Sequence, residues 1–66
     1  MLRLELERRQ ARLTQAALGR ETKVHPSTVS QIESGRVRPS ASELKRFAGA
    51  LGFKDDPAHL AEEVSR

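Results

Sequence analysis

The sequence predicts an all-α protein, folded as a compact bundle of five helices. Strong helix formers and apolar residues at helical spacing recur along the chain, and no segment has a firm strand pattern. Proline stands at the first position of two expected helices, and glycine follows the end of two. The chain has 66 residues and no Cys. We therefore expect one domain over residues 1–66, with a thin core and neither disulfides nor thiolate–zinc sites.

The first expected helix runs from about Arg3 to Arg12, a stretch without glycine or proline. Leu2 and Leu6 fall near one face of such a helix. Because Leu2, Leu4 and Leu6 also alternate along the chain, an extended start is the alternative.

The second expected helix, residues 15–22, follows Thr14, whose hydroxyl suits an N-cap. Gly19 lies inside this helix and costs about 1 kcal/mol relative to alanine. A glycine at this position indicates close backbone packing against another helix, unless it is simply tolerated.

A turn at residues 23–25 leads to the third expected helix, from Pro26 to Glu33. Proline suits the first helical position because its missing N–H would have no partner there. Gly35 follows the end of the helix and can adopt the left-handed conformation that closes it. Residues 35–39 form the longest loop that we expect.

The fourth expected helix begins at a capping box, Ser40 to Glu43, and ends at Gly52. Its apolar residues follow helical spacing: they are Leu44, Phe47, Ala48 and Leu51.

The last expected helix runs from Pro57 to about Ser65, after cap and first-turn residues Asp55 and Asp56. Its apolar residues, together with Phe53, could close the core or form a dimer seam. We favour the core role for these residues, which are Phe53, Leu60 and Val64.

Positive charge is concentrated in residues 1–53. The whole chain carries 12 Lys and Arg against 9 Asp and Glu, a net charge of +3. After Phe53 the balance is 2 − 4 = −2, so residues 1–53 carry +5. This distribution suits a polyanionic partner, although an ordinary solvated surface would have a similar charge.

Catalysis, metal binding and a cofactor are not expected. His25 and His59 have no partners at metal-ligand spacing, no nucleophile elbow accompanies the serines, and the glycines form no phosphate loop. No apolar run approaches the roughly 18 residues of a membrane span. The N-terminus is too charged for a signal peptide. We therefore expect a cytoplasmic protein that is not an enzyme and has no membrane partner.

The second and third helices form a helix-turn-helix unit at about residues 14–34. A turn of about three residues forces a steep crossing angle, so the outer face of the third helix projects from the body. Such a helix fits the major groove of duplex DNA. Periodicity turns Val29 and Ile32 inward and four residues outward, and we expect these four to contact bases: Pro26, Ser27, Ser30 and Gln31.

Phosphate contacts are expected around this helix. The amides at the start of the second helix, near Thr14 and Gln15, can bind a phosphate. Arg36 and Arg38, in the loop after the third helix, are placed to hold the DNA backbone on its other side. A loop arginine, however, often contributes nothing measurable.

An ordered set of residues resembles the lambda repressor and Cro type of helix-turn-helix. The match runs without gaps from about Leu6 to Phe53. It rests on Leu13-Thr14-Gln15, Leu18, Val24, the run Ser27 to Gly35, Arg38-Pro39-Ser40, Leu44, Ala48 and Ala50-Leu51-Gly52. No single piece is specific, but the ordered set is.

The resemblance implies a five-helix domain, a recognition helix at residues 26–33, and a dimer on a two-fold symmetric operator. It also implies phosphate contacts at Gln15 and Ser34 and base contacts at the four outward residues of the third helix. Finally, it implies that Arg8 pairs with Glu33 and ties the first helix to the recognition helix.

Four residues depart from the pattern of this family. Lys23 occupies a turn position usually held by glycine, which would force a positive φ or a shifted turn. Gly19 replaces alanine, Thr22 replaces an aliphatic residue, and His25 replaces a Ser or Thr cap. These departures weaken local stability without changing the assignment.

The sequence thus predicts a bacterial or phage-encoded transcriptional regulator that reads double-stranded DNA. A repressor that binds a short palindromic operator as a homodimer is the preferred interpretation. The alternative is an antitoxin-like or co-regulator module whose main partner is a protein, because the exposed face of the third helix carries no Lys or Arg. A domain cut from a longer regulator is a third possibility.

Overall fold

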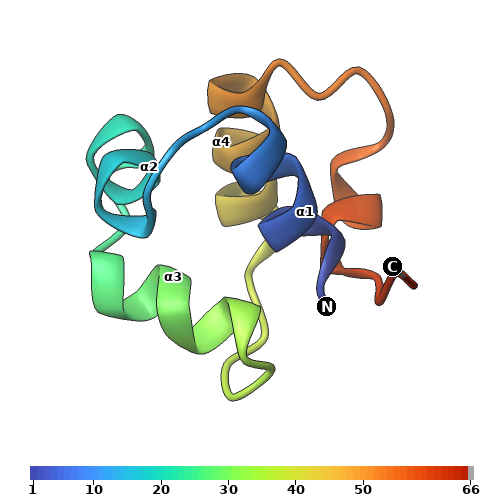
Figure 1. The fold of residues 1–66 in the computed structure, drawn as a ribbon, viewed down its shortest axis with the longest axis horizontal. Helices are drawn as coiled ribbons and strands as arrows, with labels where there is room; N and C mark the ends of the chain where they lie inside the picture. The colour runs from blue at the N-terminus through green and yellow to red at the C-terminus, as the bar shows by residue number, and fades with distance from the viewer. Residues whose placement is uncertain (66) are drawn as a thin grey trace.

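The computed structural model describes residues 1–65. It contains four α-helices and one short 3-10 helix, arranged as a nearly isometric body of 26 × 25 × 23 Å. The elements are α1 (Arg3–Gln10), α2 (Gln15–Thr22), α3 (Pro26–Glu33), α4 (Ala41–Leu51) and η1 (Pro57–Ala61). Figure 1 shows α2 and α3 on one side of α4, with α1 and η1 on the other.

One hydrophobic core joins these elements. Leu4 of α1, Leu18 of α2, Phe47 of α4 and Leu60 of η1 are each 0% exposed. The helix α4 is the longest and has the most clearly amphipathic sequence, and it packs against both α2 and η1. Because α4 contacts both halves, it holds the α2–α3 pair against the rest of the molecule.

The predicted count of five α-helices is wrong, because the last element is short and is not α-helical. The expected helix from Pro57 to Ser65 ends as a 3-10 helix at Ala61. After it, Glu63 forms an antiparallel bridge with Leu2. The Arg3 amide donates to the Glu62 carbonyl at 2.7 Å, and the Val64 amide donates to the Met1 carbonyl at 2.8 Å. These bonds hold the segment after Ala61 extended.

The first helix is also shorter than predicted, because α1 ends at Gln10 and Arg12 has a left-handed backbone. The start of α1 at Arg3 agrees with the prediction: Leu2 is extended, but Leu4 and Leu6 are helical, so the leucine alternation does not mark an extended segment. Leu60 is completely buried in the core, Phe53 is half-buried and packs against the core, and Val64 is half-buried. Residue 66, the end of the expected domain, lies outside the described residues.

The boundaries of α2, α3 and α4 agree with the prediction, and so do their caps. In the capping box of α4, the Glu43 amide donates to the Ser40 hydroxyl at 3.1 Å, and the Ser40 amide donates to the Glu43 carboxylate at 2.9 Å. Gly52 closes α4 with φ +65°.

Candidate nucleic-acid interface

The turn between α2 and α3 is tight because Gly19 has no side chain. A Cβ at this position would lie 2.4 Å from the carbonyl oxygen of Val24 and 3.2 Å from the nitrogen of Pro26. The Val24 amide donates to the Gly19 carbonyl at 3.0 Å, so the chain crosses directly over this glycine. Gly19 is therefore needed for close backbone packing and is not merely tolerated.

The residues that depart from the usual turn pattern are accommodated locally. Lys23 has φ +60°, the left-handed conformation that a glycine would adopt with less strain. His25 caps α3, since its Nδ1 accepts from the Ser27 amide at 3.1 Å. Thr22 is buried, and its hydroxyl donates to the Leu18 carbonyl at 2.8 Å.

Arg8 and Glu33 form a buried, bidentate ion pair between α1 and α3. Arg8 Nε lies 2.8 Å from Glu33 Oε2, and Nη2 lies 3.0 Å from Oε1. The third guanidinium nitrogen, Nη1, donates to the Leu13 carbonyl at 2.8 Å. The two side chains are 11% and 3% exposed. The hydrogen bond with Glu33 raises the pKa of the Arg8 guanidinium, with burial acting in the opposite direction.

Gln15 joins this cluster from the start of α2. Its Nε2 donates to Glu33 Oε1 at 2.9 Å, so Glu33 binds both Arg8 and Gln15. One carboxylate therefore connects α1, α2 and α3. Within residues 1–65, every buried side-chain nitrogen and oxygen has a hydrogen-bond partner. The position of α3 is thus fixed by charged hydrogen bonds as well as by apolar packing.

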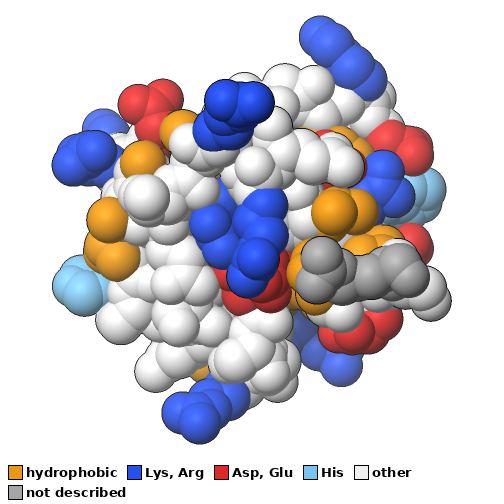
Figure 2. Space-filling model, in the orientation of Figure 1, with side chains coloured by type: hydrophobic (Ala, Val, Ile, Leu, Met, Phe, Trp, Pro, Cys, Tyr) orange, Lys and Arg blue, Asp and Glu red, His pale blue; other side chains and the backbone are white. Residues whose placement is uncertain are grey.

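The face of α3 that points away from the core is exposed to solvent. Val29 and Ile32 are 0% and 1% exposed, whereas the residues expected to contact bases are all exposed. These are Pro26, Ser27, Ser30 and Gln31. Their side chains are small or uncharged, and Figure 2 shows a mostly uncharged surface over α3, with Lys and Arg side chains above and around it. The face can approach another surface closely.

Three residues expected to contact phosphates already make hydrogen bonds within the protein. The Thr14 hydroxyl accepts from the Ala17 amide at 3.0 Å, which leaves its hydrogen free to donate. Gln15 uses one amide N–H for Glu33 and retains the other. The Ser34 hydroxyl donates to the Gln31 carbonyl at 3.0 Å, so it would have to rotate to reach a phosphate.

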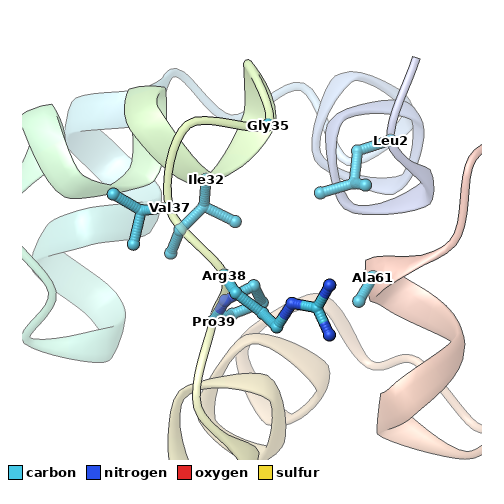
Figure 3. A pocket seen from close by; sticks show the side chains of 7 residues that line it. All are labelled: Leu2, Ile32, Gly35, Val37, Arg38, Pro39 and Ala61. Atoms are coloured by element: carbon cyan, nitrogen blue, oxygen red, sulfur yellow. The ribbon is translucent and has the colours of Figure 1, made fainter.

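The two expected loop arginines are exposed, at the end of α3. The loop folds back onto α3, because the Arg36 amide donates to the Gln31 carbonyl at 2.9 Å. Beside it lies a hollow of about 300 Å³ between this loop, Leu2 and Ala61. Figure 3 shows the Arg38 side chain extending across this hollow toward Ala61. Val37, in the same loop, is 39% exposed.

Metal-ligand clusters and membrane-spanning helices are two features that residues 1–65 lack. Residues 1–65 contain no group of three or more His, Asp or Glu side chains that could hold a metal ion. None of the helices in this range has the length and apolar character needed to cross a bilayer.

A short, sharply crossed helix pair with a projecting second helix defines a helix-turn-helix protein, a class that binds DNA. The chain belongs to the helix-turn-helix domain family, whose model matches residues 2–61. This membership agrees with the resemblance to regulators of the lambda repressor and Cro type. No curated protein and no solved structure matches the chain.

No sequence pattern predicts the bond between Gln15 and Glu33. The two residues are 18 positions apart, on different helices, and no local spacing signals such a contact. The Leu13 carbonyl, which accepts from Arg8, gives no sequence signal either.

Proposed function

We propose that this protein is a sequence-specific DNA-binding transcriptional regulator, and specifically a repressor that binds a short palindromic operator as a homodimer. The observation that carries the proposal is the geometry of α3. Its inner face is locked to α1 and α2 through Glu33, and its outer face is exposed and free of charge. A helix held rigidly on one side and exposed on the other can place side chains reproducibly against base edges.

In this proposal, Gln31 supplies the most specific base contact. Its amide can donate to and accept from one adenine at once, whereas the hydroxyls of Ser27 and Ser30 are less selective. Pro26 offers an apolar surface suited to a thymine methyl group. Phosphate contacts from Thr14, Gln15, Ser34, Arg36 and Arg38 would supply most of the affinity and make it steeply dependent on salt.

The proposal includes a dimer because a palindromic site has two symmetric half-sites about one helical turn apart, and each half-site can bind one copy of the protein. An exposed valine, Val37, and the hollow beside it offer an apolar surface at the end of α3. A second copy that covered this surface symmetrically would bring the C-terminal ends of the two α3 helices toward each other. A site of action in the cytoplasm of a bacterium, or of a phage-infected cell, is part of the same proposal.

Selection from a random duplex pool tests this function. The purified protein is incubated with the pool at moderate salt, and the retained DNA is sequenced. We expect a two-fold symmetric motif with half-sites about one helical turn apart. A retained pool that stays random would contradict sequence-specific reading.

Two variants separate base contacts from phosphate contacts on the selected operator. Gln31→Ala should relax the preference at one or two base pairs by about 1–3 kcal/mol. Arg38→Ala should weaken binding to all sequences alike and lower the salt dependence. Unchanged base preferences in Gln31→Ala would show that Gln31 does not contact bases, and a sequence-selective loss in Arg38→Ala would show that Arg38 does.

One observation supports the alternative, a module that mainly binds another protein, such as a toxin or a co-regulator. The described part of α3 presents no Lys or Arg on its exposed face. Under this alternative the protein forms a stable complex with its partner and binds DNA only feebly. Retention of a symmetric DNA motif at moderate salt, without any added protein, would exclude it.

A further inference from the structure

All four α-helices end in the same backbone motif. In each, the first or second residue after the helix has a positive φ, and the amide of the next residue donates to a carbonyl five residues earlier. The donor–acceptor pairs are Leu13 to Arg8, Val24 to Gly19, Arg36 to Gln31, and Phe53 to Ala48. Each of the four helix ends therefore needs one residue in the left-handed conformation.

The residue at the left-handed position differs among the four helices. After α3 and α4 it is glycine, Gly35 and Gly52, which adopts this conformation without strain. After α1 and α2 it is a cation, Arg12 and Lys23, each with φ +60°. A side chain with a Cβ is disfavoured in this conformation. Two of the four positions thus carry a charged side chain at a cost in stability.

Compensation of the helix dipole does not explain this distribution. A cation near a helix C-terminus is favourable, and the last turns of α1 and α2 already contain arginines. The last turns of α3 and α4 contain no basic residue, yet these helices are the two that end in glycine. If the dipole decided the residue, the cations would follow α3 and α4.

Position along the chain separates the two pairs. Arg12 stands two residues before Thr14, the N-cap of α2, and Lys23 stands two residues before His25, the N-cap of α3. Both cations therefore stand just before the start of a helix of the helix-turn-helix, α2 or α3. Gly35 and Gly52 lead instead into longer loops. Both cations are exposed, and within residues 1–65 neither forms an ion pair.

We propose that Arg12 and Lys23 are phosphate-binding residues that flank the two helices of the DNA-binding unit, and that a cation is kept at each strained position for this contact. This inference rests on the proposed function. It adds two contacts on the α2 side of the interface to those expected from Arg36 and Arg38 on the other side.

The proposal predicts that removing either cation raises the melting temperature of the free protein and lowers its affinity for DNA. Arg12→Gly and Lys23→Gly relieve the backbone strain, so each should raise the melting temperature of the free protein by a few degrees. Each should also weaken binding to a mixed-sequence duplex about two helical turns long by about threefold to tenfold, and lower the slope of log K against log salt by about 1. A residue that only closes its helix would not produce this combination.

Matched variants isolate the charge. Arg12→Asn and Lys23→Asn also remove the cation but keep a side chain that tolerates the left-handed conformation, so they should lose affinity as the glycine variants do. Arg12→Lys should retain most of the binding. Lys54→Gly removes one exposed charge from the segment between α4 and η1, away from α3 in Figure 1, and should leave the salt slope unchanged.

The outcomes distinguish this inference from the proposed function. If the wild-type protein binds the duplex and the Arg12 and Lys23 variants keep its affinity and salt slope, the inference is wrong and the function stands. If the Lys54 variant loses as much affinity as the others, general charge explains the effect and the inference is also overturned. If the wild-type protein binds no DNA, both fail.

Discussion

The helices α3 and η1 begin with the same chemistry and end differently. Each has a proline at its first position and a capping side chain just before it, His25 for α3 and Asp56 for η1. The cap bonds are also alike, 3.1 Å to the Ser27 amide and 3.0 Å to the Ala58 amide. Yet α3 completes eight residues of α-helix, whereas η1 forms five residues of 3-10 helix.

The difference lies in what each segment can bury. Along α3, Val29, Ile32 and Glu33 are buried at helical spacing, and Glu33 has partners on two other helices. Along η1, Leu60 is the buried residue, and the chain after Ala61 pairs with the N-terminal segment. Cap and proline thus specify where a helix begins, and tertiary contacts decide how far it continues.

The largest expected effect is the loss of the buried charge that anchors α3. Glu33→Gln leaves the Arg8 guanidinium buried without its counter-ion and should lower the free energy of unfolding by about 3–5 kcal/mol. Urea unfolding measures this change. In the less buried pair Arg3–Glu7, whose side chains are 37% and 21% exposed, the variant Glu7→Gln should cost less than about 0.5 kcal/mol. Similar losses in the two variants would contradict the special role of Glu33.

The next effect concerns the single apolar anchor of η1. Leu60 is 0% exposed, so Leu60→Ala should lower the free energy of unfolding by about 3 kcal/mol, through lost burial and the cavity left behind. Helical circular dichroism of the folded variant should change little, because η1 is short. A loss below about 1 kcal/mol would mean that η1 packs loosely and that its short length has another cause.

A smaller effect is expected from the two caps. Asp56→Ala should cost about 0.5–1 kcal/mol, since it removes the acceptor of the Ala58 amide. His25→Asn should instead stabilise the protein by about 0.5 kcal/mol, because Asn is a better N-cap than His. Thermal unfolding of both variants tests whether the melting temperature falls in Asp56→Ala and rises in His25→Asn. A destabilised His25→Asn would show that His25 contributes more than its cap bond.

The smallest effect is the pH dependence of stability that comes from the exposed pair Asp55 and His59. Asp55 precedes η1, His59 lies within it, and His59 Nδ1 is 3.1 Å from Asp55 Oδ2. The hydrogen bond that His59 donates to the Asp55 carboxylate raises the pKa of His59, and hydrogen bonds from the Asp56 amide and from His59 lower the pKa of Asp55. The His59 contribution is therefore complete below its unfolded pKa, near 6.5, and disappears as pH rises through the higher folded value. The Asp55 contribution is complete above 3.8 and disappears as pH falls through the lower folded value.

His59→Gln tests this last prediction. Melting temperatures between about pH 5 and 8 should fall slightly with rising pH in the wild-type protein and fall less in the variant. Added salt should reduce the difference, since the pair is exposed. If the variant keeps the full slope, another group causes the pH dependence.

Local sequence signals predicted most of the helix-turn-helix correctly. Helix starts depend on residues that are close together in the sequence. The Thr14 cap and the capping box from Ser40 to Glu43 join residues three positions apart, and the proline at position 26 fixes its own φ. The same holds for Gly35 and Gly52 at helix ends. Most of the α3 face expected to meet DNA is likewise set by helical periodicity, because Val29 and Ile32 face the core.

Such local signals did not predict contacts between residues that are far apart in the sequence. The bond from Gln15 to Glu33 depends on how α2 and α3 cross, and the early end of η1 depends on backbone bonds between Met1, Arg3 and the residues around Glu63. The sequence by itself therefore determined where helices start, which faces are apolar and which residues are exposed on α3. Only the tertiary structure decided where the last helix stops and how one carboxylate joins three helices, because backbone amides pair with whatever carbonyl the folded chain brings within reach.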